Sequence, residues 1–104
     1  MAKSAFSIWM DFSKANKQAD KLDEIASKVE KVAKNDMTNC RGTLSNGWKG
    51  DNATAYLKKM QIVEGDLASN AVNLRKIAKT IRQVAANTYK AEMAALRIAQ
   101  TKKN

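Results

Sequence analysis

Residues that could carry chemistry are few in this chain, and their spacing does not suggest a catalytic site. The 104 residues contain no histidine, which is the commonest general base and metal ligand in proteins. The single cysteine, Cys40, can form neither an internal disulfide nor a thiol-rich zinc site. The acidic residues are spread along charged segments, and no glycine-rich phosphate loop is present. The sequence therefore predicts a protein that is not an enzyme and that uses no cofactor or metal.

A basic cluster in the second half of the chain is the strongest electrostatic feature. The net charge is +9, and residues 75–104 contain eight Lys and Arg against Glu92 alone. Such a cluster attracts nucleic-acid phosphates, but no aromatic residues are interleaved with it. We interpret it first as a solvated helix face, or as a surface for an acidic partner helix or cell-wall polymer, with nucleic-acid binding as the alternative. The cluster consists of Arg75, Lys76, Lys79 and Arg82.

The same region could also lie on a membrane surface, because residues 75–99 are basic and amphipathic. The apolar face of this segment is rich in alanine and lacks deep anchors, which argues against that interpretation. No segment approaches the length of a membrane span, and the apolar run over residues 5–10 ends at Asp11. That run is too short for the core of a signal peptide. The sequence predicts neither a membrane partner nor a Sec signal peptide.

The elements that position these residues are predicted to be two long helices. Apolar residues recur every three or four positions on both sides of a short central break, and proline is absent. We predict an all-α, single-domain chain over residues 1–104 that folds as an antiparallel two-helix hairpin. Its first helix spans about 11–45, its turn 46–51, and its longer second helix about 52–100. The small residues at many seam positions would let the two helices approach closely.

We make a local prediction for each of two residues in the predicted seam. Cys40 lies at an apolar position of the first helix, so we expect its side chain to be buried. Glu64 occupies a seam position beside Gly65, so we expect that the second helix can kink there.

The N-terminal segment is unusually aromatic. Phe6, Trp9 and Phe12 are three residues apart and could line one face of a helix. They could pack on the second helix or form an exposed patch for a partner, and Ser4 or Asp11 could cap the helix that carries them.

The central turn contains a tryptophan among glycines. Three of the chain's four glycines fall within nine residues here. We expect Gly50 to adopt a positive φ angle, and Trp48 to fold back over the open end of the seam between the two helices. Asp51 or Asn52 would then cap the second helix. Trp48 and Gly50 are thus predicted to have a structural function in the turn.

The apolar stripes on both helices are wider than a two-helix hairpin can cover, which predicts a protein partner. Pairing with a second hairpin would form a four-helix bundle. The predicted partner interface on the second helix consists of Leu67, Leu74, Ile77, Ile81 and Val84.

The Trp48-Lys49-Gly50 motif at mid-chain, between two amphipathic arms, resembles the WXG family of small helical-hairpin proteins exported by type VII secretion systems. The resemblance covers the whole chain and implies pairing, with a second copy or another WXG-like protein, into a four-helix bundle. A related group in low-GC Gram-positive bacteria binds the helices of toxins that carry an N-terminal LXG domain and presents the complex to the secretion machinery. The lysine-rich composition and long basic second arm resemble that group. The implied location is the cytoplasm before export, and then the medium or the cell surface.

Many WXG proteins carry a C-terminal export signal, Tyr-x-x-x-Asp/Glu, and this chain departs from it. Tyr89 is followed at that spacing by Met93, and the acid lies one place early, at Glu92. Tyr89 and Glu92 are the candidate export signal; the alternative is that Tyr89 packs in an interface and Glu92 is solvated. In a hairpin folded about residue 48, Asp11 would lie opposite about residue 85. Residues from about 86 onward would then lack an intramolecular partner, and the candidate signal would lie on that extension.

Overall fold

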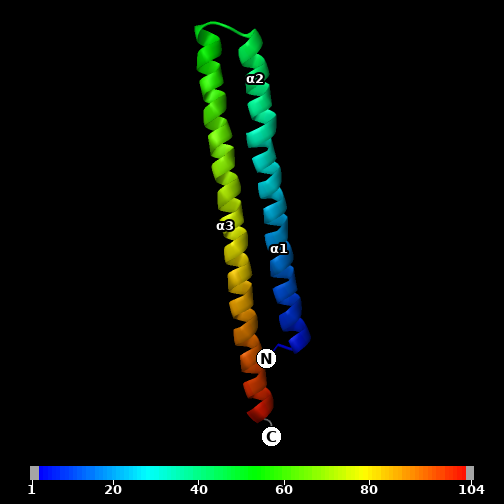
Figure 1. Cartoon of the computed structure of the whole chain (residues 1–104). Helices are drawn as coiled ribbons and strands as arrows, with labels where there is room; N and C mark the ends of the chain where they lie inside the picture. The colour runs from blue at the N-terminus through cyan, green and yellow to red at the C-terminus, as the bar shows by residue number, and fades with distance from the viewer. Residues whose placement is uncertain (1–2, 103–104) are drawn as a thin grey trace. The chain divides into compact units, whose positions relative to one another are not determined.

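The chain folds as two helical arms, of which the second is longer (Figure 1). A computed structural model describes residues 3–102, and no strand occurs within that range. The first three elements follow one another without a break and together form the first arm, and residues 48–50 connect it to the second arm. The predicted all-α class and the longer second helix are thereby confirmed. The elements are α1 (Ala5–Lys31), the π-helix η1 (Val32–Met37), α2 (Thr38–Gly47) and α3 (Asp51–Lys102).

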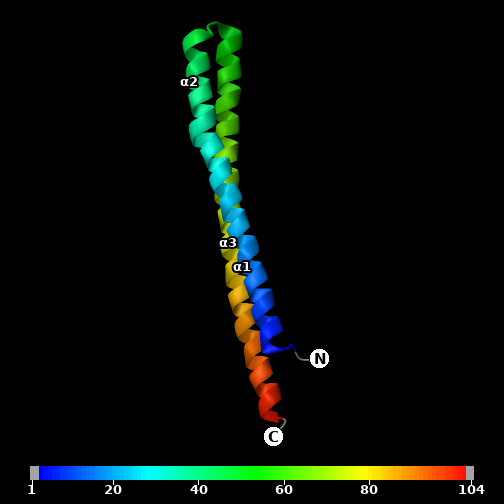
Figure 2. The same ribbon diagram turned by 90° about the vertical axis from the view of Figure 1, so that its right-hand side faces the viewer.

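The chain divides into two compact units, each built from one part of each arm. The terminal unit comprises Met1–Leu22 and Lys76–Asn104, and the turn unit comprises Asp23–Arg75. Within each unit the two arms lie side by side (Figures 1 and 2). Ion pairs give their direction: Asp20 pairs with Arg82 and Lys3 with Glu92 in the terminal unit, so residues earlier in one arm meet residues later in the other. The arms of the terminal unit are therefore antiparallel.

The turn unit follows the same rule. Glu30 pairs with Arg75, whereas Arg41, which is closer to the turn, pairs with Glu64. The arms of this unit are therefore antiparallel as well, and the connection at residues 48–50 joins them as a hairpin.

The core of both units is made mainly of alanine. Ala19, Ala26 and Ala33 are buried at intervals of seven residues on the first arm, and three further alanines are buried at the same interval on α3. Seven residues are close to two helical turns, so each set lies along one stripe of its helix. Alanine has a short side chain, so a stripe of alanines allows close approach of a neighbouring helix. The buried alanines of α3 at this interval are Ala71, Ala78 and Ala85.

The π-helix η1 overturns the prediction that Cys40 is buried, because Cys40 is exposed. A π-turn closes its hydrogen bonds to the fifth residue along the chain and so contains about one residue more than an α-turn. After Ala33, the inward-facing position therefore moves from residue 40, which the seven-residue interval predicts, to residue 41. Arg41 is partly buried in its place.

Arg41 also explains how the acidic residue Glu64 is accommodated in the seam. The Arg41 Nε donates to Glu64 Oε1 at 2.9 Å, and its second nitrogen contacts Oε2 at 3.4 Å. The Glu64 side chain is only 13% exposed, so this forked pairing satisfies a largely buried carboxylate. α3 runs as one helix through Gly65, and a kink at that position is not needed to accommodate the charge.

The turn has the glycine conformation that the sequence predicts. Gly50 has φ of 113°, a region that favours glycine, and its carbonyl accepts from the Thr54 N–H at 3.0 Å. Asp51 is the first residue of α3, so its carboxylate lies in the first helical turn, where the helix dipole favours negative charge. The Trp48 ring packs against Tyr56 with ring centroids 5.6 Å apart, and it remains partly exposed.

The first helix begins earlier than predicted, at Ala5 rather than near residue 11. Ser4 is the cap, since its Oγ accepts from the Ser7 N–H at 3.1 Å. The expected register is also wrong. The ring of Phe12 packs on Tyr89, and Lys3 contacts Glu92, so residues after 86 do have partners in the first arm. Phe12 meets Tyr89, whereas folding about residue 48 would place it opposite about residue 84, so the pairing is shifted by several residues. The early start at Ala5 lengthens the first arm without changing this register.

Candidate partner-binding groove

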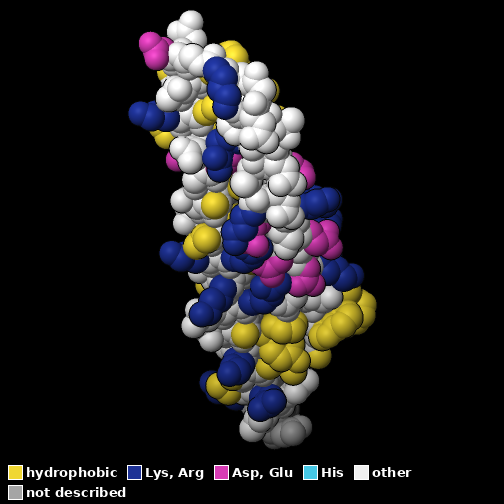
Figure 3. Space-filling view, turned by 45° about the horizontal axis from the view of Figure 1, so that its top comes forward, with side chains coloured by type: hydrophobic (Ala, Val, Ile, Leu, Met, Phe, Trp, Pro, Cys, Tyr) yellow, Lys and Arg dark blue, Asp and Glu magenta, His cyan; other side chains and the backbone are white. Residues whose placement is uncertain are grey.

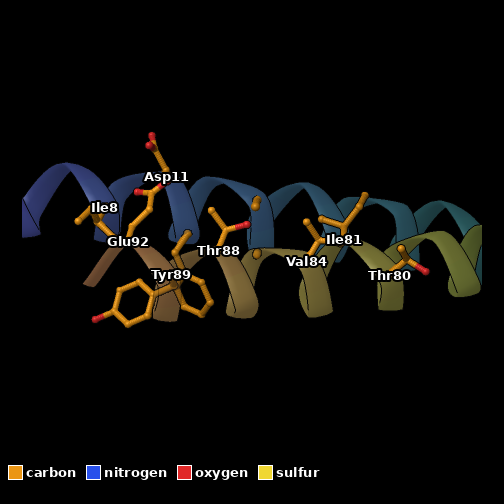
Figure 4. A pocket seen from close by; sticks show the side chains of 11 residues that line it. Ile8, Asp11, Thr80, Ile81, Val84, Thr88, Tyr89 and Glu92 are labelled. Atoms are coloured by element: carbon orange, nitrogen blue, oxygen red, sulfur yellow. The ribbon is translucent and has the colours of Figure 1, made fainter. Parts of the chain in front are cut away.

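An apolar groove lies between the two arms of the terminal unit (Figure 4). Its volume is about 370 Å³, and it is lined by one face of α1 and one face of α3. Asp11, Glu92 and two threonines form its polar edges. Its largely apolar lining suits an apolar occupant rather than a small polar ligand. The apolar lining consists of Ile8, Phe12, Ala15, Ile81, Val84, Ala85 and the ring of Tyr89.

One lysine closes an end of the groove. Lys3 Nζ donates to Asp11 Oδ2 at 3.0 Å and to Glu92 Oε1 at 3.2 Å. The hydrogen bond to Asp11 and then that to Glu92 raise the pKa of Lys3 above its ordinary value. The two acids at this end are thus paired with a cation of the same unit. A smaller cavity, of about 120 Å³, lies along Lys3, Ile8, Ala95 and Leu96.

The N-terminal aromatic residues divide between the two predicted environments. Phe12 packs on the second arm, with its ring 5.0 Å from that of Tyr89. Phe6 and Trp9 contact each other at 6.4 Å and are largely exposed. Packing on the second helix is therefore correct for Phe12, and an exposed patch is correct for the other two.

Both residues of the candidate export signal line the groove. Tyr89 packs on Phe12, and Glu92 is held by Lys3. The prediction that they lie on an extension without intramolecular partners is therefore wrong. The prediction assumed that pairing ends near residue 85, whereas the groove and its adjoining cavity continue the pairing to Leu96.

The five predicted interface residues differ in exposure. Ile77 and Val84 are about half exposed, whereas Leu67, Leu74 and Ile81 are partly buried. Ile81 and Val84 both line the groove, so two residues chosen for a partner interface lie in the same site as the candidate export signal.

Large apolar side chains border the buried alanines in both units. Ile25 and Val32 directly precede Ala26 and Ala33 in the turn unit, and Ile77 and Val84 directly precede buried alanines in the terminal unit. One residue is about 100° of helix rotation, so each large side chain projects beside the seam rather than into it. Figure 3 shows exposed hydrophobic side chains gathered on one part of the surface. Further exposed residues of this kind are Ile62, Val63, Val72 and Ile98.

The basic cluster is partly neutralised by acids of the first arm. Arg75 Nη1 lies 2.5 Å from Glu30 Oε2, and Arg82 Nη2 lies 2.7 Å from Asp20 Oδ1. The hydrogen bond from Arg75 lowers the pKa of Glu30 below its ordinary value, and Coulombic attraction to the same guanidinium adds to this shift. Lys76 and Lys79 are exposed. Two of the four basic side chains thus already have carboxylate partners, a feature that sequence reasoning missed.

Charge is distributed unevenly between the units. The terminal unit contains eleven Lys and Arg against three Asp and Glu, a net charge of +8. The turn unit contains eight against seven, a net charge of +1. The groove therefore lies in the unit that holds nearly all of the net charge.

Within residues 3–102, no group of His, Cys, Asp or Glu side chains could hold a metal ion. No helix in that range is both long and apolar enough to cross a membrane. Comparisons of the chain with protein-family models, curated proteins and solved structures find no match.

Proposed function

We propose that this chain is a type VII secretion substrate or targeting partner that works as a helical-bundle complex. Its partner is a second copy, another WXG-like protein or the N-terminal helices of an LXG toxin, and the complex is delivered to the secretion machinery. The observation that carries the proposal is the inverted distribution of side-chain size. Alanines fill the core, whereas Ile25, Val32, Ile77 and Val84 are exposed beside them.

This distribution favours assembly energetically. Fully burying a Val or Ile side chain is worth about 1.5–3 kcal/mol. Ile77 and Val84 are about half exposed, so covering both with a partner recovers about half of that amount for each. Exposed large apolar side chains at helical spacing are typical of helices that bind another helix.

The turn supports the same proposal through the resemblance to the WXG family. Trp48 and Gly50 occupy a tight connection between two antiparallel arms, with Gly50 at positive φ. The partly exposed Trp48 packs on Tyr56, so the two rings form an aromatic surface at the turn.

The alternative, nucleic-acid binding, receives less support. Arg75 and Arg82 are paired with Glu30 and Asp20, so phosphate contacts by these two arginines would first have to break intramolecular ion pairs. A groove lined largely by apolar side chains also has no counterpart on a phosphate backbone.

Assembly can be tested on the purified chain. Sedimentation equilibrium measures whether the 11.5 kDa chain is a monomer or a dimer, and co-purification tests binding to the N-terminal helices of an LXG toxin encoded beside it. We expect dimerisation or toxin binding. A chain that stays monomeric and binds neither a WXG-like protein nor a toxin from its own genome would contradict the proposal.

Export needs a separate measurement in the producing bacterium. The tagged chain, or its tagged toxin partner, should appear in the culture medium or on the cell surface, and deletion of the type VII ATPase should abolish that appearance. Tyr89→Phe and Glu92→Gln test the candidate signal while retaining the approximate side-chain shape. Unchanged export of both variants would remove Tyr89 and Glu92 from the proposal without affecting the assembly function.

A further inference from the structure

We propose that the groove of the terminal unit binds an acidic amphipathic helix of a different protein, rather than a second copy of this chain. The inference rests on the proposed function and deepens it, because it names the chemistry of the partner and the place where that partner binds. It follows from the shape of the groove, from the charge around it and from the pairing of its own acids.

The shape of the groove suits a helix. The lining residues of α3 run from Thr80 to Glu92, which corresponds to about 18 Å of helix, or three to four turns. Its apolar lining includes Ile81, Val84 and the ring of Phe12. A helix whose apolar residues continue from position i through i+3 or i+4 and i+7 to i+11 presents a ridge of about that length.

The charge around the groove selects an acidic occupant. The unit has a net charge of +8, and exposed lysines flank the lining residues on both arms. Lys14 lies one turn after Asp11 on α1, and Lys76 lies one turn before Thr80 on α3. Carboxylates on the polar edges of a bound helix would therefore meet ammonium groups, which increases both the association rate and the specificity.

The two acidic residues of the groove, Asp11 and Glu92, do not reverse the preference for an acidic occupant. Asp11 and Glu92 both contact Lys3, so the two carboxylates at the end of the groove share an intramolecular cation. A second copy that placed its own terminal unit on the groove would bring a charge of +8 against a charge of +8. Like charges across an interface are unfavourable, and this repulsion disfavours a homodimer formed through two terminal units.

The test measures binding of two synthetic helical peptides to the intact chain. Both are about 20 residues long, which exceeds the roughly 12–15 residues below which an isolated helix is marginal in water. They share one leucine face, and their polar faces carry glutamate in one peptide and lysine in the other. Fluorescence anisotropy of labelled peptide gives the affinity at low and high salt. We expect the acidic peptide to bind at least about tenfold more tightly at low salt, and the difference to shrink as salt increases.

Matched variants locate the binding site. Val84 is 57% exposed in the groove and Ile62 is 64% exposed in the turn unit, so Val84→Glu and Ile62→Glu introduce the same charge at similarly exposed positions. We expect only Val84→Glu to abolish binding of the acidic peptide. The circular dichroism of both variants should match that of the unaltered chain, because neither side chain is buried.

Charge reversal provides the second comparison. The double variant Lys14→Glu with Lys76→Glu should weaken binding of the acidic peptide about threefold to tenfold and reduce the salt dependence of that binding. The control double variant, Lys28→Glu with Lys58→Glu, places the same charges in the turn unit. We expect it to retain at least half of the affinity.

Three results would overturn the inference. The first is equal binding of the glutamate and lysine peptides, and the second is equal loss of binding in the Val84 and Ile62 variants. The third is that the acidic peptide does not bind and that Val84→Glu instead abolishes the binding of another occupant. That occupant could be a second copy of the chain, duplex DNA or vesicles of anionic lipid. The proposed function can fail separately. Export that continues without the type VII ATPase would contradict it, whereas peptide binding by the purified chain would be unaffected.

Discussion

The two units share a backbone plan but differ in where they hold charge and large side chains. Both bury alanines at seven-residue intervals. The turn unit has nearly balanced charge and contains the largely buried Arg41–Glu64 pair. The terminal unit carries a net charge of +8, an apolar groove and two exposed N-terminal aromatic residues. The contrast indicates that a common alanine seam maintains the pairing in each unit, whereas the charge and the apolar groove beside the seam differ between the units.

The largest expected effect comes from filling the shared seam. Ala78→Leu in the terminal unit and Ala71→Leu in the turn unit each add three carbons at a position with no exposed surface. We expect each to lower the free energy of unfolding by about 1–3 kcal/mol, because the helices must separate or the side chains must adopt strained rotamers. Urea denaturation of the full chain measures this loss, with the exposed Val72→Leu as control. A change below about 0.5 kcal/mol at either alanine would show that the seam is not shared.

The next effect distinguishes buried from exposed ion pairs. Arg41→Ala in the turn unit leaves the carboxylate of Glu64 without its forked partner, and we expect a loss of about 2 kcal/mol. Arg82→Ala in the terminal unit should cost less than about 1 kcal/mol, because Asp20 is 66% exposed and can be hydrated. Double-mutant cycles with Glu64→Ala and Asp20→Ala separate the pair energies from other contacts. Equal coupling energies in the two pairs would contradict the expectation that the largely buried pair contributes more than the exposed one.

A third variant tests the aromatic contact between the two arms of the terminal unit. Phe12→Ala removes a partly buried ring that packs on Tyr89, so we expect a loss of about 1–2 kcal/mol. Phe6→Ala, at a residue that is 70% exposed, should change stability by less than about 0.5 kcal/mol. Thermal unfolding followed by circular dichroism compares the two. If the ranking is reversed, the contact of Phe12 with Tyr89 does not stabilise the terminal unit.

Much of this architecture could be predicted from the sequence. The three-to-four periodicity predicts two helices, the second of them longer, and the clustered glycines predict the turn and the positive φ of Gly50. Periodicity reports a regular α-helix, however, and η1 is not one. The π-turn shifts the inward position by one residue, and for that reason Cys40 is exposed and Arg41 faces Glu64.

The groove was harder to predict, although several of its residues were identified. The sequence predicts Tyr89 and Glu92 as an export signal and Ile81 and Val84 as interface residues, but bringing the two pairs together with α1 depends on the register between the arms. Register is a long-range property that a single stripe of apolar residues does not determine. The Ser4 cap is a local signal that places the start of the first helix near Ala5, but it does not determine the register between the arms.

The smallest expected effect separates the units by pH. Arg75 lowers the pKa of Glu30 in the turn unit below 4.5, so the stability that this pair contributes is present above pH 4.5 and is lost as the pH falls through the lower, folded-state value. In the terminal unit, Asp11 and then Glu92 raise the pKa of Lys3 above 10.5. The stability from that cluster is present below pH 10.5 and is lost as the pH rises through the higher, folded-state value.

Two neutral variants can assign these pH effects to the units. Glu30→Gln should lower the Tm near neutral pH by a small amount that disappears in acid, and Lys3→Met should lower it by a small amount that disappears in strong alkali. Profiles of Tm against pH for the unaltered chain and both variants provide the measurement, and Lys28→Met is the control for loss of an exposed positive charge. A Glu30→Gln effect that persists unchanged in acid would mean that the contribution of this residue comes from packing rather than from its charge. The same persistence for Lys3→Met in alkali would mean that the groove end is held by the lysine stem, since a protonated amine is then no longer required.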